Sequence, residues 1–428
     1  MPTFVTRFGD LDPLLRGLVV AIILPSSAIT GLLAGSISDT ISRKRTIAIG
    51  GLVFAIGSAL SAGAVELGML IVGRIIAGAG EGLFLGCSGV YLCEIGPKNI
   101  RGQMMLIFQL FIATGVAMGF FICYGTIKID SSLQWRLPFI IQTISALTLA
   151  TSALFLPYSP RWLLSQGRRD EAEHVLDLLV SPRDVADRRE MMSKVDATAA
   201  IATCDGTGIP VAGSVKNKKA AFLDIWRQDV RGRTLLGLAI NVGQQLSGID
   251  FVLFFAPDLF RQAGLQEETA SFVASGVTGI LLTITTVIGY FYVDRIGRRP
   301  LFITGGAIIS TELFLIGVLY ASGGAYTAAG KWIVIVLIEL FAVTFSGSWS
   351  LVVKVYTSEI QPTKTRAAAS STGQAINQLV NFVVALTAPE FLASSTWGPY
   401  ITYAAFSLVS TAIAWAFMFE TRNRSLET

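Results

Sequence analysis

Eleven apolar stretches, each long enough to cross a lipid bilayer as a helix, constrain the fold of this chain more than any other feature. A spanning helix needs about 20 mainly apolar residues. Only 14% of the residues are charged, whereas soluble domains carry about 25%. The sequence therefore predicts an all-α polytopic membrane protein, with the lipid bilayer as its main solvent. We expect the spans at about 16–38, 46–65, 69–93, 103–125, 136–156, 232–256, 270–293, 300–321, 331–357, 367–392 and 398–418.

The residue types needed for enzyme or metal chemistry are scarce. Cys87, Cys93, Cys123 and Cys204 form no CxxC pair, and the single histidine is His174 in a charged segment. This favours neither a disulfide framework nor a metal site. The net charge of +4 gives no reason to expect a nucleic-acid partner. We expect no enzyme activity, no cofactor and no metal.

The basic residues predict the orientation of the spans. Cytoplasmic loops of membrane proteins carry an excess of Lys and Arg. If the spans alternate, the basic loops all fall on one side, which is then cytoplasmic and includes the C-terminus. We predict a multi-pass protein of the plasma membrane. The loops in question contain Arg43 to Arg45, Lys98 and Arg101, Arg295 to Arg299, Lys364 and Arg366, and Arg422 and Arg424.

One long hydrophilic segment divides the chain into two halves. It contains both signs of charge, has helical character at 168–180 and a soft stretch at 197–213. We predict a cytoplasmic linker with short amphipathic helices. The predicted parts are an N-terminal bundle at 1–156, the linker at 157–231, a C-terminal bundle at 232–418 and a cytoplasmic tail at 419–428.

The two halves repeat each other. Glu94 to Arg101 and Glu359 to Arg366 both read E-I-x-P-x-x-x-R, and Asp39 to Arg43 resembles Asp294 to Arg298. Both pairs lie on the predicted cytoplasmic side, so the halves have parallel orientation. The second half has six predicted spans and the first has five. By symmetry we expect that one helix is missing before Met1 and that the N-terminus lies outside the cell.

Several motifs along the chain together resemble the sugar porter family of the major facilitator superfamily. They are Gly35 to Arg45, Gly73-Arg74 with Gly78, Gly80 and Gly82, Trp135 to Pro138 with Gln142, Pro157 to Leu163, Gln244 to Asp250, Asp294 to Arg299, and Glu420 to Arg422 with Ser425 to Glu427. The resemblance implies two bundles with six helices each. The first of these twelve family helices is the one that we expect to be missing. It also implies transport of a monosaccharide or polyol by alternating access, possible proton coupling in a full-length form, and a monomer.

The resemblance places a substrate site at the bilayer midplane. The matching positions are Gln109, Gln244, Gln245, Asn377 and, one turn further, Asn381. Side-chain amides suit sugar hydroxyls because each offers two donors and an acceptor. The alternative is that these amides only bond neighbouring helices to each other.

Three ionisable residues in the spans are candidates for proton coupling. Asp250 stands where the family has Asn, and an ionisable group in a span is a functional hypothesis by default. Arg74 matches the family arginine whose aspartate partner is on the absent first helix. Glu81, on the same helical face as Arg74, is a substitute partner.

The tenth family helix departs most from the pattern. Lys354 replaces a tryptophan of the cavity, and two prolines are lost at 350–354, so we expect a stiffer helix. Lys354 is a further substrate-binding candidate because it could attract an acidic sugar or another organic anion. The alternatives are that it reaches the cytoplasmic surface or forms an internal ion pair.

The repeated charges predict a cytoplasmic gate. Pairs of carboxylates and guanidinium groups at helix ends could hold helices together while the inner side is closed, whereas simple topogenic charge explains only the bases. The gate candidates are Asp39, Arg43, Glu94, Arg101, Arg161, Asp294, Arg298, Glu359 and Arg366.

Other functions remain open at this point. Besides a carrier of a neutral sugar or polyol, the sequence allows a carrier of an acidic sugar or organic anion. A sugar sensor that does not transport and a truncated, inactive product are further alternatives.

Overall fold

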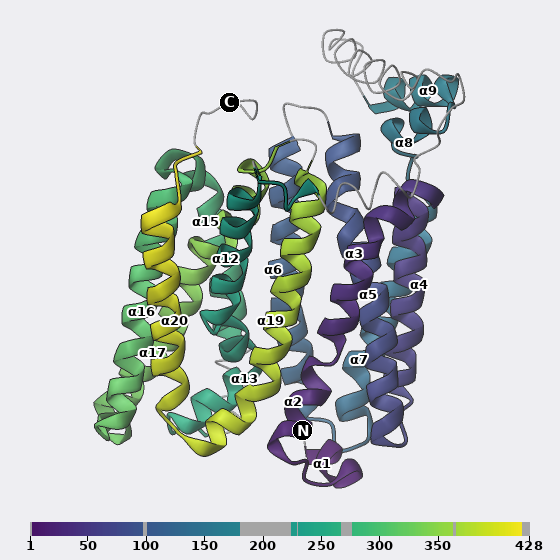
Figure 1. The fold of residues 1–428 in the computed structure, drawn as a ribbon. Helices are drawn as coiled ribbons and strands as arrows, with labels where there is room; N and C mark the ends of the chain where they lie inside the picture. Colours follow the sequence, from purple (N-terminus) through teal and green to yellow (C-terminus); the bar gives the residue numbers. More distant parts are fainter. Residues whose placement is uncertain are drawn as a thin grey trace.

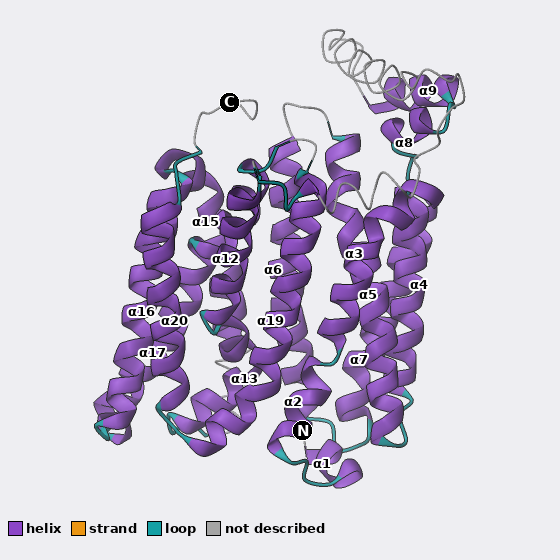
Figure 2. Cartoon of the chain, in the orientation of Figure 1, coloured by secondary structure: helices purple, strands orange, loops and turns teal. Residues whose placement is uncertain are grey.

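The described part of the chain is helical, with loops between the helices and no strand (Figure 2). The computed structural model describes residues 2–96, 101–179, 224–228, 230–266, 276–362 and 365–421. The predicted soft stretch at 197–213 and the last seven residues of the predicted tail lie outside these ranges.

The helices run up and down between two ends (Figure 1). We call the end that carries α8 and α9 the linker end, and the end where the N-terminus lies the opposite end. The helices are α1 (Pro2–Phe8), α2 (Pro13–Ala21), α3 (Ile23–Ile41), α4 (Arg43–Ala62), α5 (Leu67–Ile95), α6 (Arg101–Ile127), α7 (Leu133–Phe155), α8 (Pro160–Ser165), α9 (Arg169–Leu179), α12 (Arg231–Leu246), α13 (Ile249–Gln262), α15 (Thr278–Ile296), α16 (Arg298–Ala321), η3 (Gly324–Tyr326), α17 (Ala328–Gly347), α18 (Trp349–Glu359), α19 (Arg366–Ser394) and α20 (Gly398–Phe417).

The apolar helices account for all eleven expected spans. Ten helical segments of the described chain are long and apolar enough to cross a membrane, and α15 contains a shorter apolar run at Thr278–Gly289. Three of the spans consist of two helices each, namely α2 with α3, α12 with α13, and α17 with α18. The prediction of a polytopic helical protein is confirmed.

Small residues allow close packing within each bundle. A Cβ atom added to Gly57 of α4 would lie 2.3 Å from the backbone nitrogen of Ala77 in α5. A Cβ on Gly306 of α16 would lie 2.1 Å from the hydroxyl of Thr411 in α20. Glycine at such positions lets membrane helices approach to backbone contact. We refer to the helices up to α7 as the first bundle and to α12 to α20 as the second bundle.

The seam between the bundles is formed by α2 and α3 against α19, and by α6 against α15. A Cβ on Gly17 would lie 2.3 Å from the carbonyl oxygen of Leu386. A Cβ on Gly279 would lie 2.9 Å from Ala117. Arg16 adds an ion pair to Asp258 at 2.6 Å. These contacts lie in the half of the molecule toward the opposite end, where Figure 1 shows α2 beside α19.

The expected stiffening of the tenth family helix is wrong. This span is broken at Ser348, whose φ of −125° and ψ of −81° separate α17 from α18. Hydrogen bonds from other helices satisfy the carbonyls at the break, so no proline is needed. The Tyr292 hydroxyl donates to the Gly347 carbonyl at 2.6 Å, and the Gln244 amide donates to the Trp349 carbonyl at 3.3 Å. The indole of Trp349 stacks on Phe302 with centroids 4.5 Å apart.

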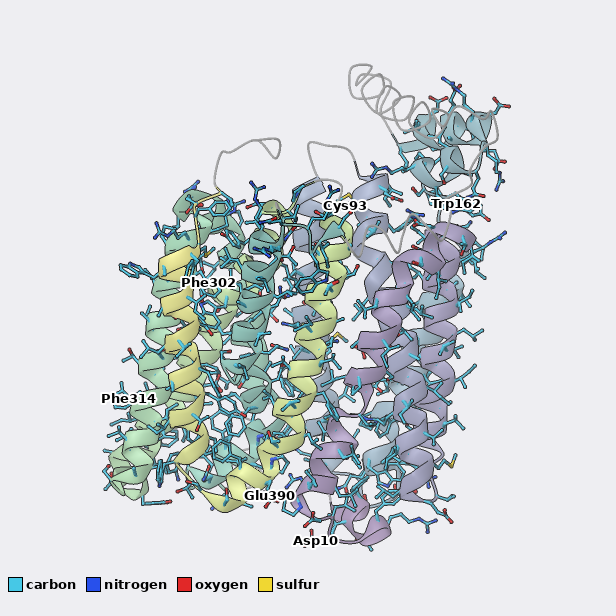
Figure 3. The ribbon with its side chains drawn as sticks, viewed as in Figure 1. Asp10, Cys93, Trp162, Phe302, Phe314 and Glu390 are labelled. Atoms are coloured by element: carbon cyan, nitrogen blue, oxygen red, sulfur yellow. The ribbon has the colours of Figure 1, made fainter. Side chains whose placement is uncertain are left out.

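The start of the linker folds onto the linker end. Trp162 of α8 is buried with Val175 of α9, and Figure 3 labels Trp162 at this end of the molecule. Helix α9 at Arg169–Leu179 confirms the predicted helical character of 168–180. Its buried face is Ala172, Val175 and Leu176, which is the spacing of an amphipathic helix.

Candidate functional site

Two of the predicted amides meet in the interior of the second bundle. Gln244 of α12 and Asn377 of α19 are buried, and the Asn377 amide donates to Gln244 Oε1 at 3.3 Å. The Asn377 amide also donates to the backbone carbonyl of Asn241 at 3.2 Å. Gln244 in turn donates to the Trp349 carbonyl at the break in the α17–α18 span. The amides thus join α12, α18 and α19, so in this structure they do bond neighbouring helices.

Gln245 and Asp250, which follow Gln244 along the chain, bond to each other. The Gln245 amide donates to Asp250 Oδ2 at 2.8 Å. The chain turns between them at Gly248, whose φ is +81° and whose added Cβ would lie 2.7 Å from Tyr403. Glycine is required there because other residues avoid this φ and a side chain would collide. The turn puts Asp250 in the first turn of α13, where the helix dipole favours a carboxylate.

Asn381 has free hydrogen-bonding capacity. It is buried one turn beyond Asn377 on α19, and its Oδ1 has no hydrogen-bond partner among the described residues. A buried amide oxygen without a partner costs free energy unless a water or ligand satisfies it. Asn241 is a cluster residue that the sequence analysis missed. Its position three residues before Gln244, on the same helix face, was an available signal.

Lys354 and Gln109 meet across the seam. The Lys354 Nζ on α18 donates to Gln109 Oε1 on α6 at 3.3 Å. The two residues belong to different bundles, so this contact joins the halves on the linker-end side of the seam. Both predicted candidates therefore lie where the halves face each other.

Arg74 does not pair with Glu81 in the described structure. Its guanidinium donates to the carbonyls of Val19 at 3.0 Å and Val20 at 2.8 Å. These carbonyls lie in the last turn of α2, next to its junction with α3 at Ile22, where the helix end leaves carbonyls without helical donors. Arg74 thus stabilises a helix end here, and the suggested substitute pairing with Glu81 is absent.

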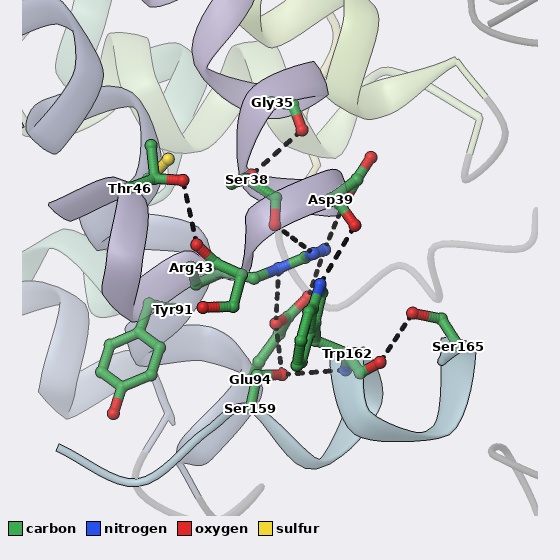
Figure 4. Close-up of polar contacts among 12 residues, drawn as sticks. Gly35, Ser38, Asp39, Arg43, Thr46, Tyr91, Glu94, Ser159, Trp162 and Ser165 are labelled. Atoms are coloured by element: carbon green, nitrogen blue, oxygen red, sulfur yellow. Dashed lines mark hydrogen bonds and ion pairs between the residues drawn. The ribbon is translucent and has the colours of Figure 1, made fainter. Parts of the chain in front are cut away.

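An ion-pair cluster joins the helices at the linker end of the first bundle (Figure 4). Arg43 binds Glu94 at 3.0 Å and Asp39 at 2.7 Å. The Ser159 hydroxyl donates to Glu94 Oε2 at 2.5 Å. We call Arg43, Glu94 and Ser159 the first clamp, which ties α4 and α5 to the start of the linker.

The second bundle repeats this cluster. Arg298 binds Glu359 at 3.2 Å, and the Thr421 hydroxyl donates to Glu359 Oε2 at 2.6 Å. We call these three residues the second clamp. Glu420 beside it accepts from the backbone N–H groups of Arg298 at 3.0 Å and Arg299 at 3.2 Å. The sequence analysis did not name Ser159, Glu420 or Thr421 as partners of the repeated charges.

The remaining gate candidates belong to neither clamp in the described part of the structure. Arg161 is exposed on α8. The side chains of Arg101, Asp294 and Arg366 lie outside the described part of the structure. Both clamps lie at the linker end, so the two halves repeat in parallel orientation as predicted.

Comparison with known proteins identifies the family. The profile of the family described as "Sugar (and other) transporter" matches residues 7–428. Sugar transport protein MST3 of Oryza sativa subsp. japonica is 32% identical over 410 residues, which cover 94% of this chain and 76% of that protein. Probable polyol transporter 6 of Arabidopsis thaliana is 31% identical over 421 residues, covering 95% of this chain and 84% of that protein.

Solved structures show the same fold. A structure described as the major facilitator superfamily proton:xylose symporter XylE matches with a TM-score of 0.79 at 24% identity, covering 100% of this chain and 92% of that one. The molecule is thus a membrane transporter of the major facilitator fold. The chain belongs to the family of sugar (and other) transporters, which are carriers and not enzymes. The resemblance noted in the sequence is confirmed.

Proposed function

We propose that this chain carries a monosaccharide or polyol across a membrane by alternating access. The observation that supports this most is the buried amide cluster of Gln244, Gln245, Asn377 and Asn381. It offers neutral donors and acceptors, which match hydroxyl groups. Relatives described as sugar and polyol transporters support the same substrate class.

The seam supplies the moving part of the mechanism. Two parallel bundles rock against each other around a site at their interface in such carriers. Here the contacts of α2 with α19 close the opposite end of the seam, and Lys354 with Gln109 joins the bundles nearer the linker end. A ligand that bonded to Asn381 and Gln109 would compete with the second contact and couple binding to motion.

The two clamps are our candidate for the gate. Each joins the ends of helices within one bundle through a buried or half-buried carboxylate. Rigid helix ends would let each bundle move as one body when the linker end opens and closes. Arg101, Arg161, Asp294 and Arg366 remain proposed members of this gate. Topogenic charge alone does not explain why Glu94 and Glu359 recur.

The orientation and partition of the chain follow from the same proposal. We assign residues 1–156 and 232–418 to the two bundles, 157–231 to a linker and 419–428 to a tail. The linker end, with its basic loops, faces the cytoplasm of a plasma-membrane protein. The carrier acts as a monomer. Asp250, Arg74 and Glu81 are the residues to test for proton coupling.

The test is uptake by the purified chain in proteoliposomes, with labelled hexoses and polyols. Gln244→Ala removes the central amide, and we expect at least tenfold weaker substrate binding because the substrate loses a hydrogen bond to this amide. Gln166→Ala, an exposed glutamine at the end of α8, is the matched control and keeps wild-type binding. Equal binding by Gln244→Ala and the control would refute this site. Absence of any sugar or polyol binding by the wild type would refute the function.

A further inference from the structure

Lys354 is a cation in the spans that makes no ion pair with a described residue. Its Nζ donates to the neutral Gln109 Oε1 at 3.3 Å, and within the described part of the chain it makes no ion pair. The Lys354 side chain is exposed on the face of α18 that points toward the first bundle. An ammonium group offers three donors, so this one has unused capacity.

The geometry of Lys354 fits neither of the two structural alternatives, which are reaching the cytoplasmic surface and forming an internal ion pair. It does not extend to the linker end, because it bonds Gln109, which lies two turns inside α6 from Arg101. It does not neutralise a described carboxylate either. Asp250 accepts from Gln245, Glu312 from Thr344 and Glu339 from Thr278. Glu81 forms no ion pair among the described residues.

Lys354 lies on α18, the helix to which the amide cluster bonds. Trp349, whose carbonyl accepts from Gln244, lies five residues earlier on α18. At about 1.5 Å of rise per residue, this separates the two positions by about 7.5 Å along the helix. This axial separation is within the length of one small ligand that bonds to the amides with its hydroxyls and to the ammonium with another group.

We propose that the ligand of this site is a monosaccharide that carries a carboxylate, such as a uronate, and that Lys354 binds this carboxylate. The proposal rests on the proposed function and narrows its substrate class. The ammonium group is exposed at the seam, so an anionic ligand can reach it and form a charge-assisted hydrogen bond while its hydroxyls use the amides. Lys354 would then exchange Gln109 for the ligand, which releases one contact between the bundles.

The experiment compares glucuronate with glucose as probes, by direct binding to the purified full chain and by uptake into proteoliposomes. We expect the wild type to bind glucuronate more tightly than glucose. In Lys354→Gln the preference for glucuronate over glucose should fall at least tenfold, because a charge-assisted hydrogen bond is lost. Lys354→Arg should retain most of the preference, since it keeps the charge.

Lys331→Gln is the charge-matched control. Lys331 lies at the opposite end and donates to the Gly264 carbonyl, so its removal should leave the preference unchanged. The proposal is overturned if the wild type binds glucose but not glucuronate, or if Lys354→Gln and Lys331→Gln show the same preference. In both cases the neutral-sugar function stands. If neither probe nor any other sugar or polyol binds, the proposed function fails as well.

Discussion

At the scale of single residues, the repeat contains one local conflict between sequence and backbone. Ser42 and Gly297 occupy equivalent places before α4 and α16, with φ of 95° and 102°. Only glycine adopts this region without strain. The first half therefore holds a serine in a glycine conformation, while the second half keeps the glycine.

We predict opposite effects of exchanging these two residues. Ser42→Gly should raise the free energy of unfolding by about 1 kcal/mol, because it removes backbone strain and loses only a long 3.4 Å hydrogen bond from the Arg45 N–H. Gly297→Ser should be destabilising, since its Cβ would lie 2.7 Å from Glu420 Oε2. Thermal unfolding of the detergent-purified protein measures both. A lower melting temperature for Ser42→Gly would contradict the argument.

At the scale of elements, α2 and α19 make the closest approach across the seam. Gly17 faces the backbone of Leu386, and an apolar cluster of Ala21, Leu24 and Ala385 continues the contact. The apolar pattern of these helices is equally compatible with a lipid-facing surface. The absence of a side chain at Gly17 is what allows the two backbones to touch.

Gly17→Ala should therefore separate these helices. Its Cβ would lie 2.3 Å from the Leu386 oxygen, so we expect a loss of about 1–3 kcal/mol, as for other overpacked sites. Gly35→Ala on the next helix, where no atom lies within 4 Å of the added Cβ, is the control and should cost nothing measurable. Melting temperatures of the two variants give the comparison. Equal values would show that the helices do not meet as described.

At the scale of the whole molecule, the two ends of the seam differ. Arg16 and Asp258 connect the bundles at the opposite end, and Asp258 also binds Arg261 of its own helix. Figure 3 labels Asp10 and Glu390 at this same end. Because Arg16 and Asp258 are on different bundles, their ion pair exists only while this end is closed.

We predict that Asp258→Asn shifts the molecule toward opening at this end. The shift should be about two- to threefold, since a partly exposed ion pair contributes about 0.5 kcal/mol. The rate at which an impermeant maleimide labels a cysteine at Leu386→Cys reports the opening. Asp258→Glu keeps the negative charge beside both arginines, so it should retain the wild-type rate. An unchanged labelling rate in Asp258→Asn would show that this ion pair does not keep the opposite end closed.

Much of the candidate site was predictable because the chain keeps sequence motifs of its family. Gln244, Gln245 and Asn377 were identified from the resemblance to the family, and Gln244 and Asn377 bond to each other in the structure. The clamps were predictable in part, since Arg43 with Glu94 and Arg298 with Glu359 were among the named charges. Ser159 and Thr421 were not, because a hydroxyl carries no charge and its partner depends on where the chain returns.

The sequence by itself determined the number of spans, their helical form and the parallel repeat, because apolar length and repeated motifs are local properties of the chain. Only the tertiary structure decided the partners of polar groups inside the bundle. Arg74 binds carbonyls instead of Glu81, the α17–α18 span breaks without proline, and Lys354 reaches Gln109 on the other bundle. In a medium without water, each of these groups takes the nearest available partner, and which one is nearest depends on helices far apart in the sequence.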